Sequence, residues 1–178
     1  DYVDLVGQSL GGPMTIAFHA RWDALNNWAR LCDFGDGPAD NNIEIANYET
    51  SSTIRFAIYA PDWYGTASDN SIVIGAWAHV VATVQGMTMK VYEDGTVVAN
   101  TDDGQEPASL TRANHWLGRS AFPSDGYFQG AIKSMQIWSR ALDADEVASL
   151  YALGGACLAT PSSLPTPAPT APTSLPTP

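Results

Sequence analysis

Short apolar runs with a period of two constrain this chain more than any other feature of its sequence. Ile16 and Phe18 alternate with polar or small residues, and residues 54–58 and 80–84 follow the same rule. This period places alternate side chains on opposite faces of an extended strand, so each run predicts a half-buried β-strand. Gly, Asn and Asp residues separate the runs, as turns require. The pattern favours a fold built mainly of antiparallel strands.

Two tight turns are expected within this pattern. Asp94-Gly95 stands between two strand-like runs in residues 91–98, and such a pair favours a hairpin because the primed turn needs positive φ. A second turn is predicted at Gln85-Gly86.

One segment has a helical pattern. Residues 143–146 match a capping box, and Gly154-Gly155 can end the helix that follows. The apolar face of this helix would consist of Val147, Leu150 and Tyr151. Residues 1–159 are therefore predicted to form one all-β domain, a two-sheet antiparallel jelly-roll sandwich with one short C-terminal helix.

Residues 160–178 have a different composition, with seven of the twelve prolines and no charge, glycine or aromatic residue. Proline fixes φ and removes a backbone donor, so this tail is predicted to be extended and polyproline-II-like. Composition alone favours a passive linker. The interleaved hydroxyls also resemble mucin-type or hydroxyproline-rich glycoprotein stalks. Because the chain has no Asn-x-Ser/Thr sequon, any attached sugar is expected to be O-linked.

The candidate O-glycosylation sites are Thr160, Ser162, Ser163, Thr166, Thr170, Thr173, Ser174 and Thr177. The candidate hydroxyproline sites are Pro161, Pro165, Pro167, Pro169, Pro172, Pro176 and Pro178.

Several motifs in the domain occur in a recognisable order. They lie at residues 75–84, 89–95, 116–120, 127–132 and 138–142. Together, over about residues 1–153, they resemble the laminin-G-like, concanavalin A-like jelly-roll family. The resemblance implies the same sandwich and places Trp77 and Trp138 at core positions. Because the family includes lectins, pentraxin-like modules, glucanases and adhesive spacers, function has to be argued from sites.

Charge excludes two classes of partner. With 8 basic and 19 acidic residues, the net charge of −11 disfavours nucleic acid and anionic membrane surfaces. No apolar run approaches the roughly 18 residues of a membrane span. The chain begins at Asp1 with neither an initiator Met nor a signal peptide, so we expect a processed product or part of a longer chain.

Catalysis is not expected. The family members that cleave β-glucans carry two glutamates flanking an aspartate on one strand, and no Glu-x-Asp-x-Glu pattern occurs here. The nearest acidic cluster, at residues 143–146, is explained by helix capping. His19, His79 and His115 lie in separate strand-like runs, which favours packing over metal binding, and no cofactor is required.

Calcium is the one metal that the sequence suggests. Residues 33–42 are dense in the hard oxygen donors that Ca²⁺ prefers, and the candidate ligands are Asp36, Asp40 and Asn42. A polar surface turn has the same composition. Lys133-Ser134 stands where many relatives carry acidic residues, which argues against a site that depends on that strand.

Aromatic residues supply a candidate sugar site. Carbohydrate binding needs an aromatic platform and a few convergent polar groups, and the candidates are Trp22, Trp28, Trp63 and Tyr64. The alternative is that these side chains fold over an edge of the core. Aromatic grooves also receive proline-rich segments, so the same residues could bind the tail of a neighbouring copy.

The only two cysteines, Cys32 and Cys157, are predicted to form a disulfide, with two free buried thiols as the alternative. These observations together predict a non-catalytic structural or adhesive module of an extracellular glycoprotein. It would assemble into a surface fibre through its tail, by self-association or with other glycoproteins. A lectin module with the tail as a spacer is the alternative, and a hydrolase is a distant third.

Overall fold

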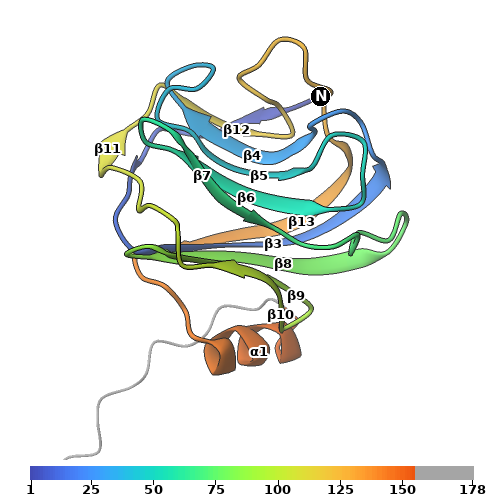
Figure 1. Ribbon diagram of the computed structural model, residues 1–178. Coiled ribbons are helices and arrows are strands. Elements are labelled where there is room, and N and C mark those ends of the chain that lie inside the picture. The colour runs from blue at the N-terminus through green and yellow to red at the C-terminus, as the bar shows by residue number, and fades with distance from the viewer. Residues whose placement is uncertain (155–178) are drawn as a thin grey trace, which may run out of the picture.

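A computed structural model describes residues 1–154, which form two β-sheets packed face to face with one helix outside them (Figure 1). The elements are β1 (Val3–Asp4), β2 (Ser9–Leu10), β3 (Met14–Ala24), β4 (Arg30–Gly35), β5 (Ile43–Asn47), β6 (Ile54–Tyr59), β7 (Trp63–Ala67), β8 (Trp77–Gln85), β9 (Thr88–Glu93), β10 (Thr96–Thr101), β11 (Leu110–Thr111), β12 (Asn114–Leu117), β13 (Gln129–Trp138) and α1 (Ala144–Ala152).

The strands pair antiparallel throughout, in the order β1-β12-β4-β5-β6-β7 in one sheet and β10-β9-β8-β3-β13 in the other. A third, two-stranded sheet pairs β11 with β2. Strands that are neighbours in a sheet are often distant in the sequence, as β12 and β4 are. The predicted all-β jelly-roll sandwich is confirmed.

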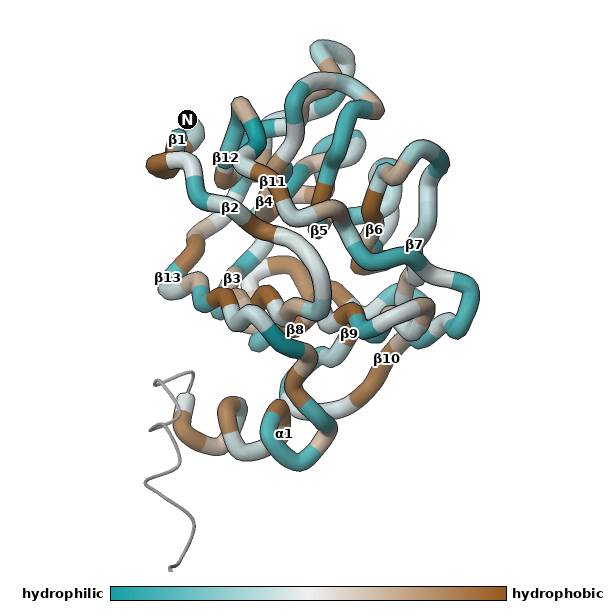
Figure 2. The backbone as a smooth tube through the Cα atoms, turned by 90° about the vertical axis from the view of Figure 1, so that its left-hand side faces the viewer, coloured by the Kyte–Doolittle hydropathy of each residue, from teal (hydrophilic) through white to brown (hydrophobic). Residues whose placement is uncertain are grey.

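The core lies between the two large sheets and follows from the alternation of residues along the strands. In β3, Ile16 and Phe18 face inward and are fully buried. In β5 and β6, Ile45 and Phe56 also face inward and are fully buried. Figure 2 shows hydrophobic and polar positions alternating along these strands. Alternation also fixes which side chains point away from the core, and these build the site described below.

Both predicted hairpin turns are present. Asp94 and Gly95 have φ of 49° and 81° between β9 and β10, and Gly86 has φ of 58° between β8 and β9. These are the positive values that tight hairpins need.

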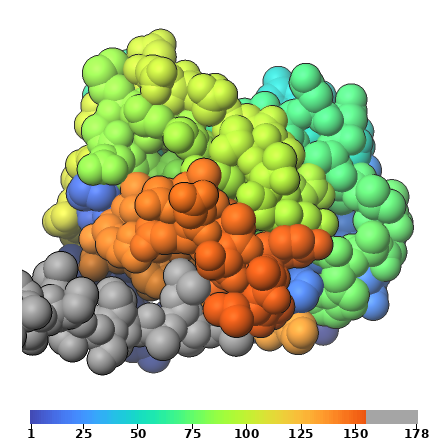
Figure 3. Space-filling model, turned by 90° about the horizontal axis from the view of Figure 1, so that it is seen from below, coloured from blue at the N-terminus to red at the C-terminus, as the bar shows by residue number. Residues whose placement is uncertain are grey.

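The predicted helix is α1, and its capping box is formed. Asp143 accepts a hydrogen bond from the backbone of Glu146, whose side chain accepts one from the backbone of Asp143. Val147 and Leu150 are buried against the outer face of the five-stranded sheet, so α1 lies outside the sandwich (Figure 3). Tyr151 is 45% exposed, so the prediction that it shares the buried face is wrong.

The two tryptophans assigned to packing differ in their environment. Trp138 packs on the apolar cluster beneath α1, as expected. Trp77 is 42% exposed, because it lies at the outward position opposite Arg21, and its assignment to the core is corrected.

No helix among residues 1–154 is long and apolar enough to cross a membrane. The tail at 160–178, its candidate modification sites and Cys157 lie outside the described residues.

Candidate functional site

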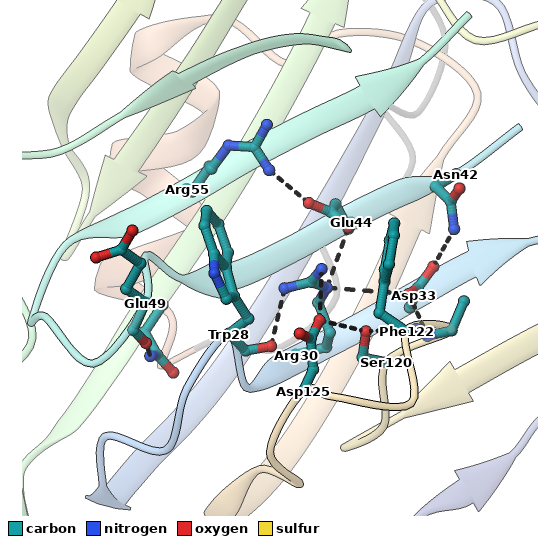
Figure 4. A network of polar contacts seen from close by, with 12 residues as sticks. Trp28, Arg30, Asp33, Asn42, Glu44, Glu49, Arg55, Ser120, Phe122 and Asp125 are labelled. Carbon is teal, nitrogen blue, oxygen red and sulfur yellow. Dashed lines mark hydrogen bonds and ion pairs between the residues drawn. The ribbon is translucent and has the colours of Figure 1, made fainter. Parts of the chain in front are cut away.

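Charged side chains gather on the outer face of the six-stranded sheet. Because the isoleucines of β5 face the core, Glu44 between them points outward, and Arg55 of β6 does so for the same reason. Arg30 and Asp33 of β4 complete the group, as Figure 4 shows. The loop between β12 and β13, residues 118–128, closes one side of this group through Asp125.

Arg30 is the centre of the network and is only 3% exposed. Its Nε lies 3.0 Å from Oε2 of Glu44, its Nη2 lies 3.1 Å from Oδ2 of Asp125, and its Nη1 donates to the carbonyl oxygen of Trp28 at 2.8 Å. A buried guanidinium is tolerated only with such partners. Arg30 therefore ties two strands of the sheet and the 118–128 loop together.

Asp33 and Asp125 anchor the loop. One carboxylate oxygen of Asp33 accepts from the backbone N–H of Ala121 at 2.8 Å, and the other accepts from Nδ2 of Asn42 at 2.8 Å. Asp125 accepts from the hydroxyl of Ser120 at 2.7 Å. These bonds fix one wall of the site.

Burial changes the proton affinities in the network. It raises the pKa of Glu44 to about 7, against the opposing influence of Arg30 and Arg55, and it also raises the pKa of Asp33. Burial lowers the pKa of Arg55. These shifts mark the site as a partly dehydrated polar surface, which is where binding sites are often found.

Two tryptophans flank Arg55, the more exposed of the two arginines in the network. The Arg55 guanidinium lies 5.5 Å from the ring centre of Trp28 and 5.2 Å from that of Trp63, and its Nη1 donates to Oε1 of Glu44 at 2.6 Å. The Phe122 ring, from the 118–128 loop, has its centre 6.4 Å from that of Trp63. The resulting pocket of about 290 Å³ is lined by Trp28, Arg30, Glu44, Arg55, Trp63, Phe122 and Asp125.

The four predicted aromatic ligands do not lie together. Trp28 and Trp63 line the pocket, and Trp63 is 38% exposed. Trp22 is 1% exposed and packs edge-on against Phe128, so it belongs to the core and its assignment to a ligand site is wrong. Tyr64 is half-buried against the core because neighbours on a strand point to opposite faces, and its assignment is also corrected.

The charged members of the pocket were missed by the sequence analysis. A signal was present for Glu44 and Arg55, each of which interrupts an apolar run at an outward position. No local pattern marks Asp125 or Phe122, because these two residues lie more than sixty residues beyond β6 in the chain.

A larger cavity of about 580 Å³ lies elsewhere, between the N-terminal segment and β13. Its lining includes Leu5, Met14, Phe34, His115 and Ile137. This lining is largely aliphatic and aromatic and carries no cluster of converging charged groups. The smaller pocket is therefore the candidate functional site.

Hydrogen bonds already engage the candidate calcium ligands. Asp36 accepts from the backbone of Ala113 and from the side chain of Asn41, and Oδ1 of Asn42 accepts from the backbone of Asp40. No group of three or more His, Cys, Asp or Glu side chains in the described part of the chain could hold a metal. Calcium binding by this loop stays a prediction.

Cys32 is fully buried in the core between the sheets and is a free cysteine in the described structure. Burial raises the pKa of its thiol. The α1 helix, which precedes Cys157 in the chain, packs on the opposite face of the five-stranded sheet. Cys157 itself lies outside the described residues, so the disulfide stays a prediction.

The fold and the sequence motifs together define the class of protein. The family model of the concanavalin A-like lectin/glucanases superfamily, Laminin_G_3, matches residues 1–148. The chain therefore belongs to this superfamily, as its motifs indicated. No curated protein matches the sequence.

Solved structures show the same fold at low identity. Domain 4 of an extracellular GH43 arabinanase from Geobacillus stearothermophilus, in complex with arabinotriose, matches with a TM-score of 0.69 and 19% identity, covering 84% of this chain and 72% of that one. The CBM40 of a Ruminococcus gnavus sialidase, bound to α2,3-sialyllactose, matches at 0.67 and 14%, covering 85% and 96%. Domains LG4-5 of the mouse laminin α1 chain match at 0.63 and 15%, covering 80% and 41%.

Proposed function

We propose that this chain is a non-catalytic carbohydrate-binding module that holds a neutral sugar in the pocket between Trp28, Trp63 and Phe122. The observation that carries the proposal is the placement of Trp28 and Trp63 against partly exposed Arg55, with Phe122 beside Trp63, above a buried charge network. An aromatic wall combined with a few fixed polar groups is the combination that sugar binding requires.

Each part of the pocket has a chemical role in this proposal. The exposed Trp63 ring stacks on the C–H face of a sugar ring. Arg55 donates hydrogen bonds to sugar hydroxyls, and Asp125, held by Arg30 and Ser120, accepts from them. The network fixes these groups before the ligand arrives, which lowers the entropic cost of binding.

Charge favours a neutral ligand over an acidic one. The network contains the carboxylates of Asp33, Glu44 and Asp125 and the guanidinium groups of Arg30 and Arg55. These charges nearly balance, and the whole chain carries −11. An anionic sugar therefore gains little attraction at the pocket.

The similar structures support a binding role, since the arabinanase domain and the CBM40 were each solved with a bound oligosaccharide. The superfamily also contains glycosidases. In this pocket, however, Glu44 and Asp125 are both ion-paired to Arg30, which does not suit the contrasting acid and nucleophile roles of a hydrolase. We also propose an extracellular location, where free or cell-surface glycans are available.

The test is calorimetric titration of the full chain with arabinotriose as the neutral probe and sialyllactose as the acidic one. We expect stronger binding of the neutral sugar, and Trp63→Ala should weaken it by about tenfold or more. Trp77→Ala is the matched control, because Trp77 is equally exposed but lies on the other sheet. Equal affinities for Trp63→Ala and the unchanged chain would overturn the proposal.

Assembly into a surface fibre depends on residues 160–178, outside the described structure, and no observation on residues 1–154 supports it. It stays a prediction. Mass spectrometry of the tail peptide from the natural source checks its premise, since the predicted stalk carries hydroxyproline or O-linked sugar.

A further inference from the structure

Two histidines lie directly opposite each other on the outer face of the five-stranded sheet. His19 of β3 pairs in register with His79 of β8, and their ring centres are 6.4 Å apart at an interplanar angle of 85°. The sequence suggested separate strand-like settings for the histidines. Both histidines lie in separate strands, as expected, and the β3–β8 pairing brings these two segments, sixty residues apart in the chain, side by side.

Both rings have an unused nitrogen. Nδ1 of His19 and Nδ1 of His79 are each shielded from solvent and have no hydrogen-bond partner in the described structure. His79 is only 3% exposed. A buried polar atom without a partner is costly, so each such atom calls for an explanation.

We infer that His19 and His79 form a two-histidine site for a divalent transition metal such as Zn²⁺ or Ni²⁺. Neutral imidazole is a good ligand for these ions, and one ion between the rings provides the missing partner for both nitrogen atoms. This site is separate from the proposed sugar pocket, which lies on the other sheet.

The ring separation is close to what a shared ion requires. A Zn–N distance of about 2.1 Å and about 1.1 Å from the nitrogen to the ring centre put each centre about 3.2 Å from the ion. Two rings on one ion then have centres at most about 6.4 Å apart, and about 5.2 Å apart in tetrahedral geometry. Tetrahedral binding therefore requires the half-buried His19 side chain to rotate so that its ring centre moves about 1 Å towards that of His79.

The surroundings suit a cation. Asp94 lies beside His79 and accepts a hydrogen bond from its backbone N–H at 2.9 Å. Arg21, two residues from His19 on the same strand, is held by Asp23 in two contacts of 2.7 and 3.1 Å, which offsets its charge. Trp77 packs edge-on against the His19 ring, and Tyr151 stacks on the His79 ring.

Two protein ligands leave coordination positions for water or for a side chain of another molecule. No third His, Cys, Asp or Glu joins the pair within residues 1–154. We therefore expect reversible binding, weaker than that of a four-ligand structural zinc site.

The test is a titration of the full chain with zinc chloride and nickel chloride, followed by calorimetry and by NMR of the imidazole ¹⁵N nuclei. We expect one ion per chain, with shifts confined to His19 and His79. His19→Gln should weaken binding by about tenfold or more, because one of two ligands is lost. His115→Gln is the matched control, since His115 is buried elsewhere in the sandwich.

Three results would overturn the inference: no binding of either ion, shifts at other histidines, or unchanged affinity in His19→Gln. His79→Gln removes the other ligand and should weaken binding in the same way. If this variant fails to fold, His19→Gln still decides the question, because His19 is less buried. Sugar titrations with the same variants should be unaffected, so the two proposals fail independently.

Discussion

Arg30 shows how one residue can organise a surface. It joins Glu44 of the next strand to Asp125 of a distant loop and also donates a hydrogen bond to the carbonyl oxygen of Trp28. Removing one partner from such a group leaves the other charges buried and unpaired. The pocket and its stability therefore depend on the same contacts.

The titration of Glu44 should make the stability of the folded protein depend on pH. Its folded pKa of about 7 lies above the ordinary value of 4.5, so between these values the folded protein holds a proton that the unfolded chain releases. The contribution of Glu44 to stability is therefore largest below about pH 4.5 and falls as pH rises towards 7.

Glu44→Gln removes this titration. We expect the stability of the unchanged protein relative to the variant to fall by on the order of 2 kcal/mol between pH 5 and 7.5. Urea unfolding of both proteins at the two pH values measures the difference. A difference in unfolding free energy that is constant with pH, or that grows in favour of the unchanged protein as pH rises, would contradict the raised pKa. It would show that ion pairing to Arg30 and Arg55 offsets or outweighs the effect of burial on the pKa of Glu44.

At the scale of elements, the helix cap yields a second prediction. Asp143→Ala removes the side chain that caps α1, and we expect a loss of about 1 kcal/mol in unfolding free energy. Asp145→Ala is the matched control, because Asp145 also lies in the first turn but has no part in the capping box. Denaturant unfolding should separate the two variants, and equal losses would show that helix-dipole charge matters more than the cap.

The hairpin turns offer a third prediction. Gly95 and Gly86 both have positive φ, but a Cβ at Gly95 would lie 3.3 Å from Ala148 and Tyr151 of α1, whereas one at Gly86 meets nothing within 4 Å. Gly86→Ala therefore costs about 1 kcal/mol of backbone strain, and Gly95→Ala costs more. Thermal unfolding of the two variants compares them, and equal melting temperatures would refute a tight turn–helix contact.

Elements with local signals were predictable from the sequence. Alternation located the strands, Asp94-Gly95 located a turn, and Asp143 located the start of the helix. Of the pocket residues, only Trp28 and Trp63 were predicted from the sequence. Their pairing could not be predicted, because Arg55 comes to lie between them only in the folded chain. The assignment of Trp22 and Tyr64 to a ligand site was wrong for a related reason. The face that a residue occupies depends on strand register rather than on nearness to a turn.

At the scale of the whole molecule, the described structure contains its own core. Within residues 1–154, the buried clusters draw on residues from Met14 to Leu150. A chain ending at residue 159 is therefore predicted to unfold at the same temperature as the full chain and to bind arabinotriose equally well. A lower melting temperature, measured by calorimetry, would show that the tail stabilises the domain.

We propose that sugar binds at the Trp28–Arg55–Trp63 pocket. The most direct measurement is an NMR titration of the ¹⁵N-labelled full chain with arabinotriose, which follows the indole N–H signals of its tryptophans. The pocket predicts that the Trp28 and Trp63 signals shift with one common saturation curve while those of Trp22 and Trp77 stay in place. Shifts centred on Trp77, or no shifts at saturating sugar, would contradict the claim.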